Sequence, residues 1–251
     1  MPEGLKVQKV NWISYSYFII RHVEYHTTFD RFEVLIIKHT TMTSTYLNLL
    51  FHLIKSNDWG QIESIFFSDP QGEQTFQNLV AEAKKDSRSG VTVLHACASL
   101  NAPVDLFIRM VELCPSALSS QDSLGRTPLH LAAGIGADTD VIKVLVDSHP
   151  EACEIQDEDG KTPLHIACEL APFYENIKTL LKGSPNAAIM EDESGISAIE
   201  YTLESGAHLE TLRLVQLVAQ KVTMKKHHQE KSNNPRRRYG RKASLRMLNK
   251  S

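Results

Sequence analysis

The sequence contains few cysteines and no long hydrophobic run. Its four cysteines include no Cys-x-x-Cys pair, and no histidine is placed to complete a zinc site with them. We therefore expect reduced core thiols in an intracellular protein of the cytoplasm, the nucleus or both. No window approaches the roughly 18 uninterrupted apolar residues that a membrane-spanning helix needs, so no transmembrane segment is predicted.

The N-terminus lacks the features of a secretory signal peptide. Its apolar patch, Trp12 to Ile20, is broken by Ser14 and Ser16, and no Ala-x-Ala-like cleavage site follows it. Residues 1–45 are nevertheless too apolar and aromatic for a typical disordered tail. They form a separate N-terminal segment that does not fit the repeat, and two alternatives stay open: it packs on the N-terminal cap, or it is poorly ordered.

Motifs for catalysis and cofactor binding are also absent. The sequence has no glycine-rich phosphate loop, no nucleophile elbow and no cluster of metal-binding side chains. Gly134-Ile135-Gly136 is a glycine pair at a helix end, without the spacing of a dinucleotide-binding fingerprint. We predict that the protein is not an enzyme and has no catalytic residue, metal site, cofactor or small-molecule substrate.

Charge is distributed unevenly along the chain, although the net charge is only −3. Residues 225–251 contain ten Lys and Arg against one acid, Glu230, so this tail carries +9. Residues 1–45 carry +1, which leaves −13 on residues 46–224. An acidic body followed by a basic tail is informative about partners and not about the fold.

Four segments of the chain repeat with a period of 35 residues. The period is marked by glycines, and two residues after each comes a four-residue block that begins with Thr or Ser. A proline recurs at the same spacing, followed two residues later by alanine. Three residue classes that share one period indicate a tandem array. The glycines are Gly90, Gly125, Gly160 and Gly195; the blocks are Thr92-Val93-Leu94-His95, Thr127-Pro128-Leu129-His130, Thr162-Pro163-Leu164-His165 and Ser197-Ala198-Ile199-Glu200; the prolines are Pro115, Pro150 and Pro185.

Each unit carries the signals of a turn and two helices. Thr127 is suited to cap a helix, Pro128 to occupy its first turn, and Gly125 to supply the positive φ of the preceding bend. Asp122 and its equivalents can accept hydrogen bonds from the backbone of that bend. An apolar stripe then predicts a second helix, which Pro150 is expected to stop. Neither helix can bury its apolar face alone, so the units must stack into an all-α solenoid.

The block Gly-x-Thr-Pro-Leu-His, followed by Leu131-Ala132-Ala133 or Ile166-Ala167-Cys168, resembles the ankyrin repeat. The resemblance covers approximately residues 86–220 and is strongest in the units of Gly125 and Gly160. It implies a solenoid of helix-turn-helix units that binds proteins. Because the usual period is about 33 residues, we expect the two extra residues to lie in the connections. The domains that we predict are an N-terminal segment (1–45), an ankyrin-repeat domain (46–224, with a cap at 46–70, an inserted helix at 71–86 and repeats at about 87–121, 122–156, 157–191 and 192–224) and a basic, disordered tail (225–251).

The motif histidines and one tryptophan of this domain are interpreted as structural residues. The resemblance implies that His95, His130 and His165 are structural and hydrogen-bond the turn of their own or the next repeat. No second ligand or acid–base partner recurs beside them, as a metal or catalytic histidine would need. In the N-terminal cap, Trp59 is expected to lie in the core.

The resemblance implies that turn tips and exposed positions of the first helix contact the partner. Three of the matching positions, Leu124, Ile135 and Leu170, are apolar, so the contact is expected to be partly hydrophobic. The acidic tips near Glu158 and Glu193 would either steer a basic partner segment or be simply solvated. The predicted partner-binding residues are Arg88, Ser89, Val91, Ser99 and Leu100; Ser123, Leu124, Arg126, Gly134 and Ile135; Glu158, Asp159, Lys161, Glu169 and Leu170; and, in the degenerate fourth repeat, Glu193, Ser194, Ile196, Leu203 and Glu204.

The basic tail leaves several interpretations open. Residues Arg236, Arg237, Arg238, Arg241 and Lys242 could form a nuclear-import signal, a nucleic-acid or anionic-membrane patch, or a solvated tail, or they could fold back on the acidic body. Ser244 follows two basic residues and resembles a site for basophilic kinases. The function we predict is a non-catalytic recognition module, an adaptor or scaffold for an unidentified protein. The alternative is a nuclear or nucleic-acid-associated regulator that uses this tail.

Overall fold

The structure is a computed structural model that describes residues 42–68, 70–86 and 90–233, with side chains for residues 47–68, 70–80 and 90–229. The chain divides into two compact units, Met1–Leu50 and Phe51–Ser251. Helix α3 (Met42–Lys55) crosses that boundary, and every element below belongs to the second unit. Within the described residues the secondary structure is helical apart from one isolated bridge, between Glu191 and Ser197, which confirms the all-α fold.

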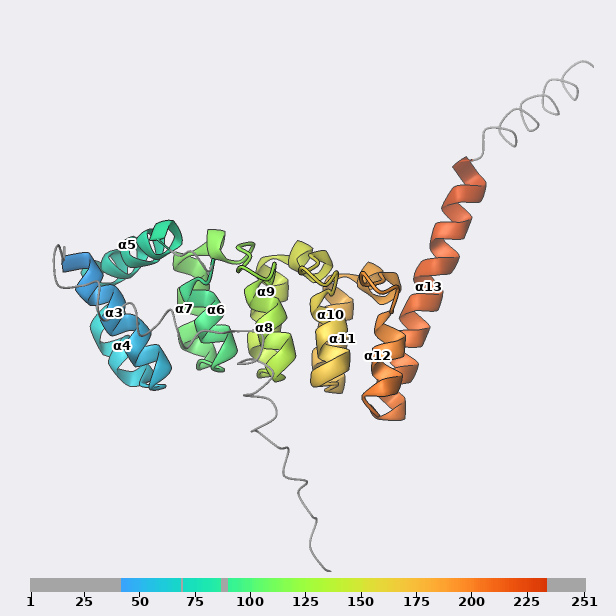
Figure 1. The fold of residues 1–251 in the computed structure, drawn as a ribbon, viewed down its shortest axis with the longest axis horizontal. Helices are drawn as coiled ribbons and strands as arrows, with labels where there is room; N and C mark the ends of the chain where they lie inside the picture. Colours follow the sequence, from blue (N-terminus) through green and yellow to red (C-terminus); the bar gives the residue numbers. More distant parts are fainter. Residues whose placement is uncertain (1–41, 69, 87–89, 234–251) are drawn as a thin grey trace, which may run out of the picture. The chain divides into compact units, whose positions relative to one another are not determined.

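Helices of the second unit stand side by side in a row of antiparallel pairs (Figure 1). Each first helix packs on the first helix of the next pair, and each second helix on the next second helix. Short 3₁₀-helices connect successive pairs. The pairs are α6 (Val93–Ser99) with α7 (Val104–Leu113), α8 (Pro128–Ile135) with α9 (Thr139–Ser148), α10 (Pro163–Leu170) with α11 (Tyr174–Gly183) and α12 (Ala198–Glu204) with α13 (Leu209–Asn233); the connections are η1 (Pro115–Ala117), η2 (Pro150–Glu154) and η3 (Pro185–Ile189).

The recurring prolines do not end the second helices, although the sequence pattern predicted that they would. Helix α9 ends at Ser148, His149 forms its C-cap, and Pro150 is the first residue of η2. Proline therefore opens the 3₁₀ connection, where its missing N–H is not needed, instead of terminating the helix directly. Ala152 and Ala187 then turn inward and are buried, which explains why a small residue recurs two positions after the proline.

Small side chains line the contacts between successive first helices. Ala132, Ala133, Ala167 and Cys168 are all buried to 1% exposure or less. The four cysteines of the chain are buried and free of disulfides. Burial raises the pKa of Cys168 to about 12, so its thiol is neutral and serves as a packing group.

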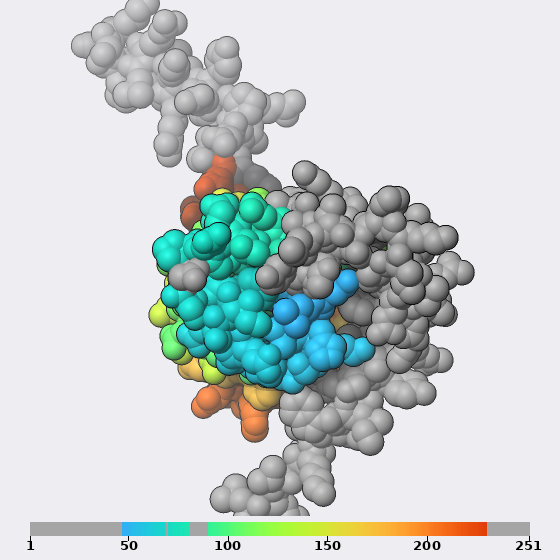
Figure 2. All heavy atoms as spheres, turned by 90° about the vertical axis from the view of Figure 1, so that its left-hand side faces the viewer, coloured from blue at the N-terminus to red at the C-terminus, as the bar shows by residue number. Residues whose placement is uncertain are grey.

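The N-terminal end of the second unit is formed by α4 (Trp59–Phe66) and α5 (Pro70–Asp86). Their side chains present a continuous surface at this end (Figure 2). Phe76 of α5 is buried against Phe67, with ring centroids 5.0 Å apart. Trp59 is only partly buried, against expectation, because it begins α4 while Ile62 and Phe66 supply the buried face.

Arg109 of α7 ties this end to the first repeat. Its guanidinium donates to the Phe67 carbonyl at 2.7 Å and pairs with Glu73 at 2.7 Å. It also lies over the Phe67 ring, 4.8 Å from the centroid. One side chain thus connects α4, α5 and α7.

The last helix is much longer than the sequence pattern predicts. A disordered tail was expected from Lys225, but α13 continues to Asn233 and projects beyond the other helices (Figure 1). The expected start of the tail is therefore wrong for residues 225–233. The 35-residue spacing places Gln220 where earlier units have Pro150 and Pro185, so nothing interrupts the helix there.

Candidate partner-binding surface

Each repeat begins with a turn, which we call a finger, and an aspartate closes the fingers of the second, third and fourth repeats; Asp122 and Asp192 are buried and Asp157 is partly buried. Asp122 accepts hydrogen bonds from the N–H groups of Leu124 (3.0 Å) and Arg126 (2.9 Å). It also forms an ion pair with the Arg126 guanidinium at 2.7 Å. Asp157 and Asp192 make the same two backbone bonds in the following fingers, as expected from their position. The turn carboxylates are structural because their oxygens are used within the finger.

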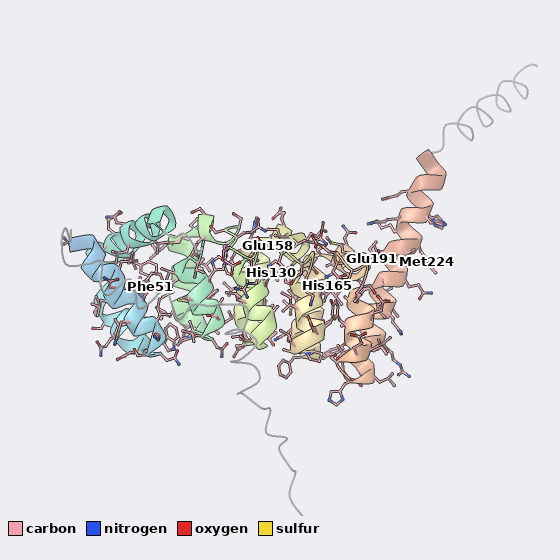
Figure 3. All side chains as sticks on the ribbon, in the orientation of Figure 1. Phe51, His130, Glu158, His165, Glu191 and Met224 are labelled. Carbon is pink, nitrogen blue, oxygen red and sulfur yellow. The ribbon has the colours of Figure 1, made fainter. Side chains whose placement is uncertain are left out.

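In the first two blocks a histidine joins its helix cap to the next repeat. Figure 3 labels His130 and, in the third block, His165. Nδ1 of His130 accepts the Thr127 N–H at 3.0 Å, so the ring proton sits on Nε2, which donates to the Lys161 carbonyl at 3.2 Å. Burial lowers the pKa of His130 to about 4, which keeps the ring neutral near pH 7. His95 makes the equivalent bond to Arg126, so the structural interpretation is confirmed.

The third histidine departs from this pattern. Nε2 of His165 donates to the Met190 carbonyl at 3.0 Å, and not to Ile196, which holds the position equivalent to Lys161. The ring of Tyr201 packs edge-on against His165 at 5.9 Å, and the Tyr201 hydroxyl donates to Asp192 at 2.6 Å. An aromatic residue thus takes part in the contact between the third and fourth repeats.

Backbone hydrogen bonds join successive fingers into one row. The N–H of Glu158 donates to the Leu124 carbonyl at 3.0 Å, and that of Glu193 to the Asp159 carbonyl at 3.1 Å. Gly160 has a φ of +75°, and a Cβ there would lie 2.6 Å from the Glu193 nitrogen. Glycine is therefore required both by the left-handed conformation and by the close approach of the next finger.

Residues 94–191 match the family model of ankyrin repeats, in three copies. Residues 94–191 therefore carry ankyrin repeats. The match covers the fingers of the second and third repeats and the histidines His95, His130 and His165. No curated protein matches the chain significantly. Ankyrin repeats generally mediate protein–protein interaction, and the family is generally non-enzymatic.

The ankyrin fingers expose fewer of the predicted contact residues than expected. Ser123, Glu158 and Asp159 are exposed at the tips. Arg126, however, is held by Asp122 and its side chain is only 14% exposed. Lys161 pairs with Glu169 at 2.6 Å and lies over the Tyr201 ring at 4.7 Å. Both cations already have partners within their own repeats.

Gly134 was predicted to contact the partner, and this prediction is wrong. It is buried, and a Cβ at this position would lie 3.0 Å from the Ile166 side chain of α10. The missing side chain lets α8 and α10 approach closely, so Gly134 is a packing residue between ankyrin repeats. A partner cannot reach it while the two helices remain in contact.

An apolar row crosses the ends of three stacked first helices. Leu100, Ile135 and Leu170 are spaced by 35 residues at the C-terminal ends of α6, α8 and α10. Leu100 is 38% exposed and the other two are partly buried. We call these three residues the apolar row. Ser99 and Glu169 directly precede two of its members and are partly buried.

Sequence reasoning missed two further exposed apolar side chains, one in a loop and one at a helix start. Phe173, between α10 and α11, is 58% exposed, and Leu209 at the start of α13 is 58% exposed. A Cβ on Gly136 would come within 2.8 Å of the Phe173 ring, so the ring lies on the α8 C-cap beside Ile135. Leu203 of α12, expected with less support, is 56% exposed. The position of Phe173, an aromatic residue directly before the second helix α11, could have indicated its exposure.

The remaining predicted residues fall into three groups. Val91, Leu124 and Ile196 are partly buried, while Glu193, Ser194 and Glu204 are exposed. Arg88 and Ser89, the basic residues Arg236, Arg237, Arg238, Arg241 and Lys242, and Ser244 lie outside the described residues. Within the described part of the chain, no group of three or more His, Cys, Asp or Glu side chains could hold a metal ion. No helix among those residues is long and apolar enough to cross a membrane.

Proposed function

We propose that the protein is a non-catalytic recognition module, an adaptor or scaffold, that binds a partner protein through the concave face of its ankyrin repeats. The observation that supports this most directly is the apolar row together with Phe173. These side chains come from three consecutive repeats; Leu100 and Phe173 are exposed and Ile135 and Leu170 partly so, whereas the other faces of the same helices are buried. Contiguous exposed apolar surface rimmed by polar residues is typical of protein interaction sites.

The apolar row supplies the energy of the proposed contact. Full burial of a Leu, Ile or Phe side chain contributes about 1.5–3 kcal/mol relative to exposure. Because Ile135 and Leu170 are already partly buried, Phe173 and Leu100 have the most surface left to lose. We expect these two to be the energetic centre of the contact, since a few large side chains carry most of the binding energy in interfaces.

The finger tips act mainly on orientation and rate of association. Glu158, Asp159 and Glu193 are exposed carboxylates at successive tips. Exposed charges at the rim of an interface steer the approach of an oppositely charged partner and add little affinity. Arg126 and Lys161, held by Asp122 and Glu169, would have to exchange existing ion pairs to contact a partner.

Affinity capture with the full chain tests this function. The wild-type chain is compared with a Leu100→Ser/Leu170→Ser variant and with a control, Leu217→Ser, which changes a side chain 50% exposed on α13. We expect partners identified by mass spectrometry to disappear with the double variant and to remain with the control. Circular dichroism must show the same helix content for all three chains. Retention of every partner by a folded double variant would refute the proposed surface.

A further inference from the structure

The row of fingers is open at its C-terminal end. A Cβ placed on Gly90, Gly125 or Gly160 would lie 2.6, 2.9 or 2.6 Å from backbone atoms of the next finger. Gly195 has the same conformation, with φ +76°, but nothing lies within 4 Å of such a Cβ. Among the described residues, the fourth finger therefore has no neighbour on its outer side.

This open end presents hydrogen-bond acceptors. The carbonyls of Leu124 and Asp159 each receive an N–H from the following finger, and the period makes Ser194 the next carbonyl in the series. Gln156 in the third finger donates its side-chain amide to the Glu191 carbonyl at 3.0 Å. The equivalent residue in the fourth finger is Glu191 itself, whose carboxylate accepts and cannot donate. A segment that continues the row must therefore bring donors, and preferably cations.

A groove lies beside these acceptors. It is shallow and open, has a volume of about 610 Å³, and is lined by both apolar and polar side chains. Earlier repeats fold back after their second helix through a proline-led 3₁₀ segment, and η2 and η3 pack on one another. With Gln220 in place of proline, α13 runs straight on and no such segment covers η3. The groove is lined by Ala188, Ile189, Glu191, Ser197, Ile199, Gln216, Ala219, Gln220 and Thr223.

We infer that this open end binds the chain's own basic segment, residues 234–251. The segment carries seven Lys and Arg and no acid, which complements the exposed carboxylates of Glu191 and Glu193. In Figure 3 Glu191 lies beside α13 at the level of Met224, where the helix leaves the body. The inference goes beyond the proposed concave-face function and does not depend on it.

The length of the chain permits this contact. Ten residues separate Thr223 in the groove from Asn233, and they rise about 15 Å as helix. The 18 residues that follow can span up to about 60 Å, so they can return along α13 to the groove. Because the segment is tethered, its effective concentration is of the order of millimolar, and a contact too weak for a separate peptide is sufficient.

Trypsin digestion of the native full chain tests the inference. The rate of cleavage between Arg236 and Lys242 is followed by intact mass at low salt. We compare the wild type with Glu191→Gln/Glu193→Gln and with a control of equal charge change, Glu63→Gln/Glu112→Gln, whose sites are exposed on α4 and α7. Cleavage should be about tenfold faster in the first variant, corresponding to about 1.4 kcal/mol, and unchanged in the control. Addition of 0.5 M NaCl should bring the wild type close to the first variant, since the Debye length falls to a few ångströms.

Two results would overturn the inference. Equal cleavage rates for the wild type and the Glu191→Gln/Glu193→Gln variant, at low and high salt, would show that these carboxylates do not hold the segment. Protection that increases with protein concentration would assign the groove to the tail of a second copy and not to the same chain. Neither result would bear on Leu100 or Leu170, so failure here is distinguishable from failure of the proposed function.

Discussion

Alanine substitutions at two glycines with the same backbone conformation distinguish the energy of finger stacking from the energy of local backbone strain. Gly160 and Gly195 have φ values of +75° and +76°. A Cβ at Gly160 would lie 2.6 Å from the Glu193 nitrogen, whereas a Cβ at Gly195 would meet nothing within 4 Å. Alanine at either position therefore incurs the same left-handed strain, but only the Gly160→Ala variant must also displace a neighbouring finger.

The magnitudes follow from these contacts. Left-handed strain costs an alanine about 1–2 kcal/mol, which is the full effect expected for Gly195→Ala. In the Gly160→Ala variant the Glu193 backbone must move, which breaks its hydrogen bond to the Asp159 carbonyl and costs about 1–2 kcal/mol more. We therefore expect total losses in the free energy of unfolding of about 1–2 kcal/mol for Gly195→Ala and about 3 kcal/mol for Gly160→Ala.

Urea unfolding monitored by circular dichroism measures the two losses in the full chain at 0.5 M NaCl, where screening should keep the basic segment 234–251 off the fourth finger. Amide hydrogen exchange at Glu193 provides a local readout, because the N–H of this residue is the donor between the third and fourth fingers. Its exchange should accelerate in Gly160→Ala and stay unchanged in Gly195→Ala at matched stability. Equal losses in the free energy of unfolding for the two variants would show that stacking of the fourth finger on Gly160 adds no stability, or that Gly195 is covered as Gly160 is.

Two further predictions concern pH and the N-terminal end of the second unit. Burial lowers the pKa of His130 to about 4 from an ordinary value near 6.5, so the unfolded chain binds the proton more readily than the folded chain. The free energy of unfolding should therefore be constant above pH 6.5 and fall as the pH drops toward 4. A urea midpoint that is the same at pH 5 and pH 7 would contradict this. Arg109→Ala should cost about 1–3 kcal/mol because it leaves the Phe67 carbonyl without its charged donor. Hydrogen exchange should then speed up in α4 and α5 and remain slow in α10, whereas a uniform change would argue against a local role.

The fold could be predicted largely because its determinants are local and periodic. A cap such as Thr127, the proline after it and the glycine before it lie within a few residues, and a 35-residue spacing repeats them. The stacking of helix pairs follows because neither helix buries its apolar face alone. The length of α13 was missed because it depends on an absence, the missing proline at Gln220, and not on a positive signal.

The candidate surface could be predicted less well because exposure depends on neighbours that are distant in sequence. Gly134 occupies an exposed position in the family pattern, yet Ile166 of the next repeat packs on it. Arg126 and Lys161 sit at the fingers, yet Asp122 and Glu169 hold them. Phe173 follows no repeating pattern, and its exposure results from the way its ring rests on Gly136.

The affinity of a captured partner for two single variants tests the central claim most directly. Phe173→Ala and Met224→Ala each remove a large apolar side chain, 58% and 57% exposed, one beside the apolar row and the other on α13. Calorimetric titration should show at least about a tenfold loss of affinity for Phe173→Ala, because an anchoring side chain contributes 1.4 kcal/mol or more. Met224→Ala should bind within about twofold of the wild type. Unchanged affinity in Phe173→Ala, or a loss only in Met224→Ala, would contradict recognition through the concave face of the ankyrin repeats.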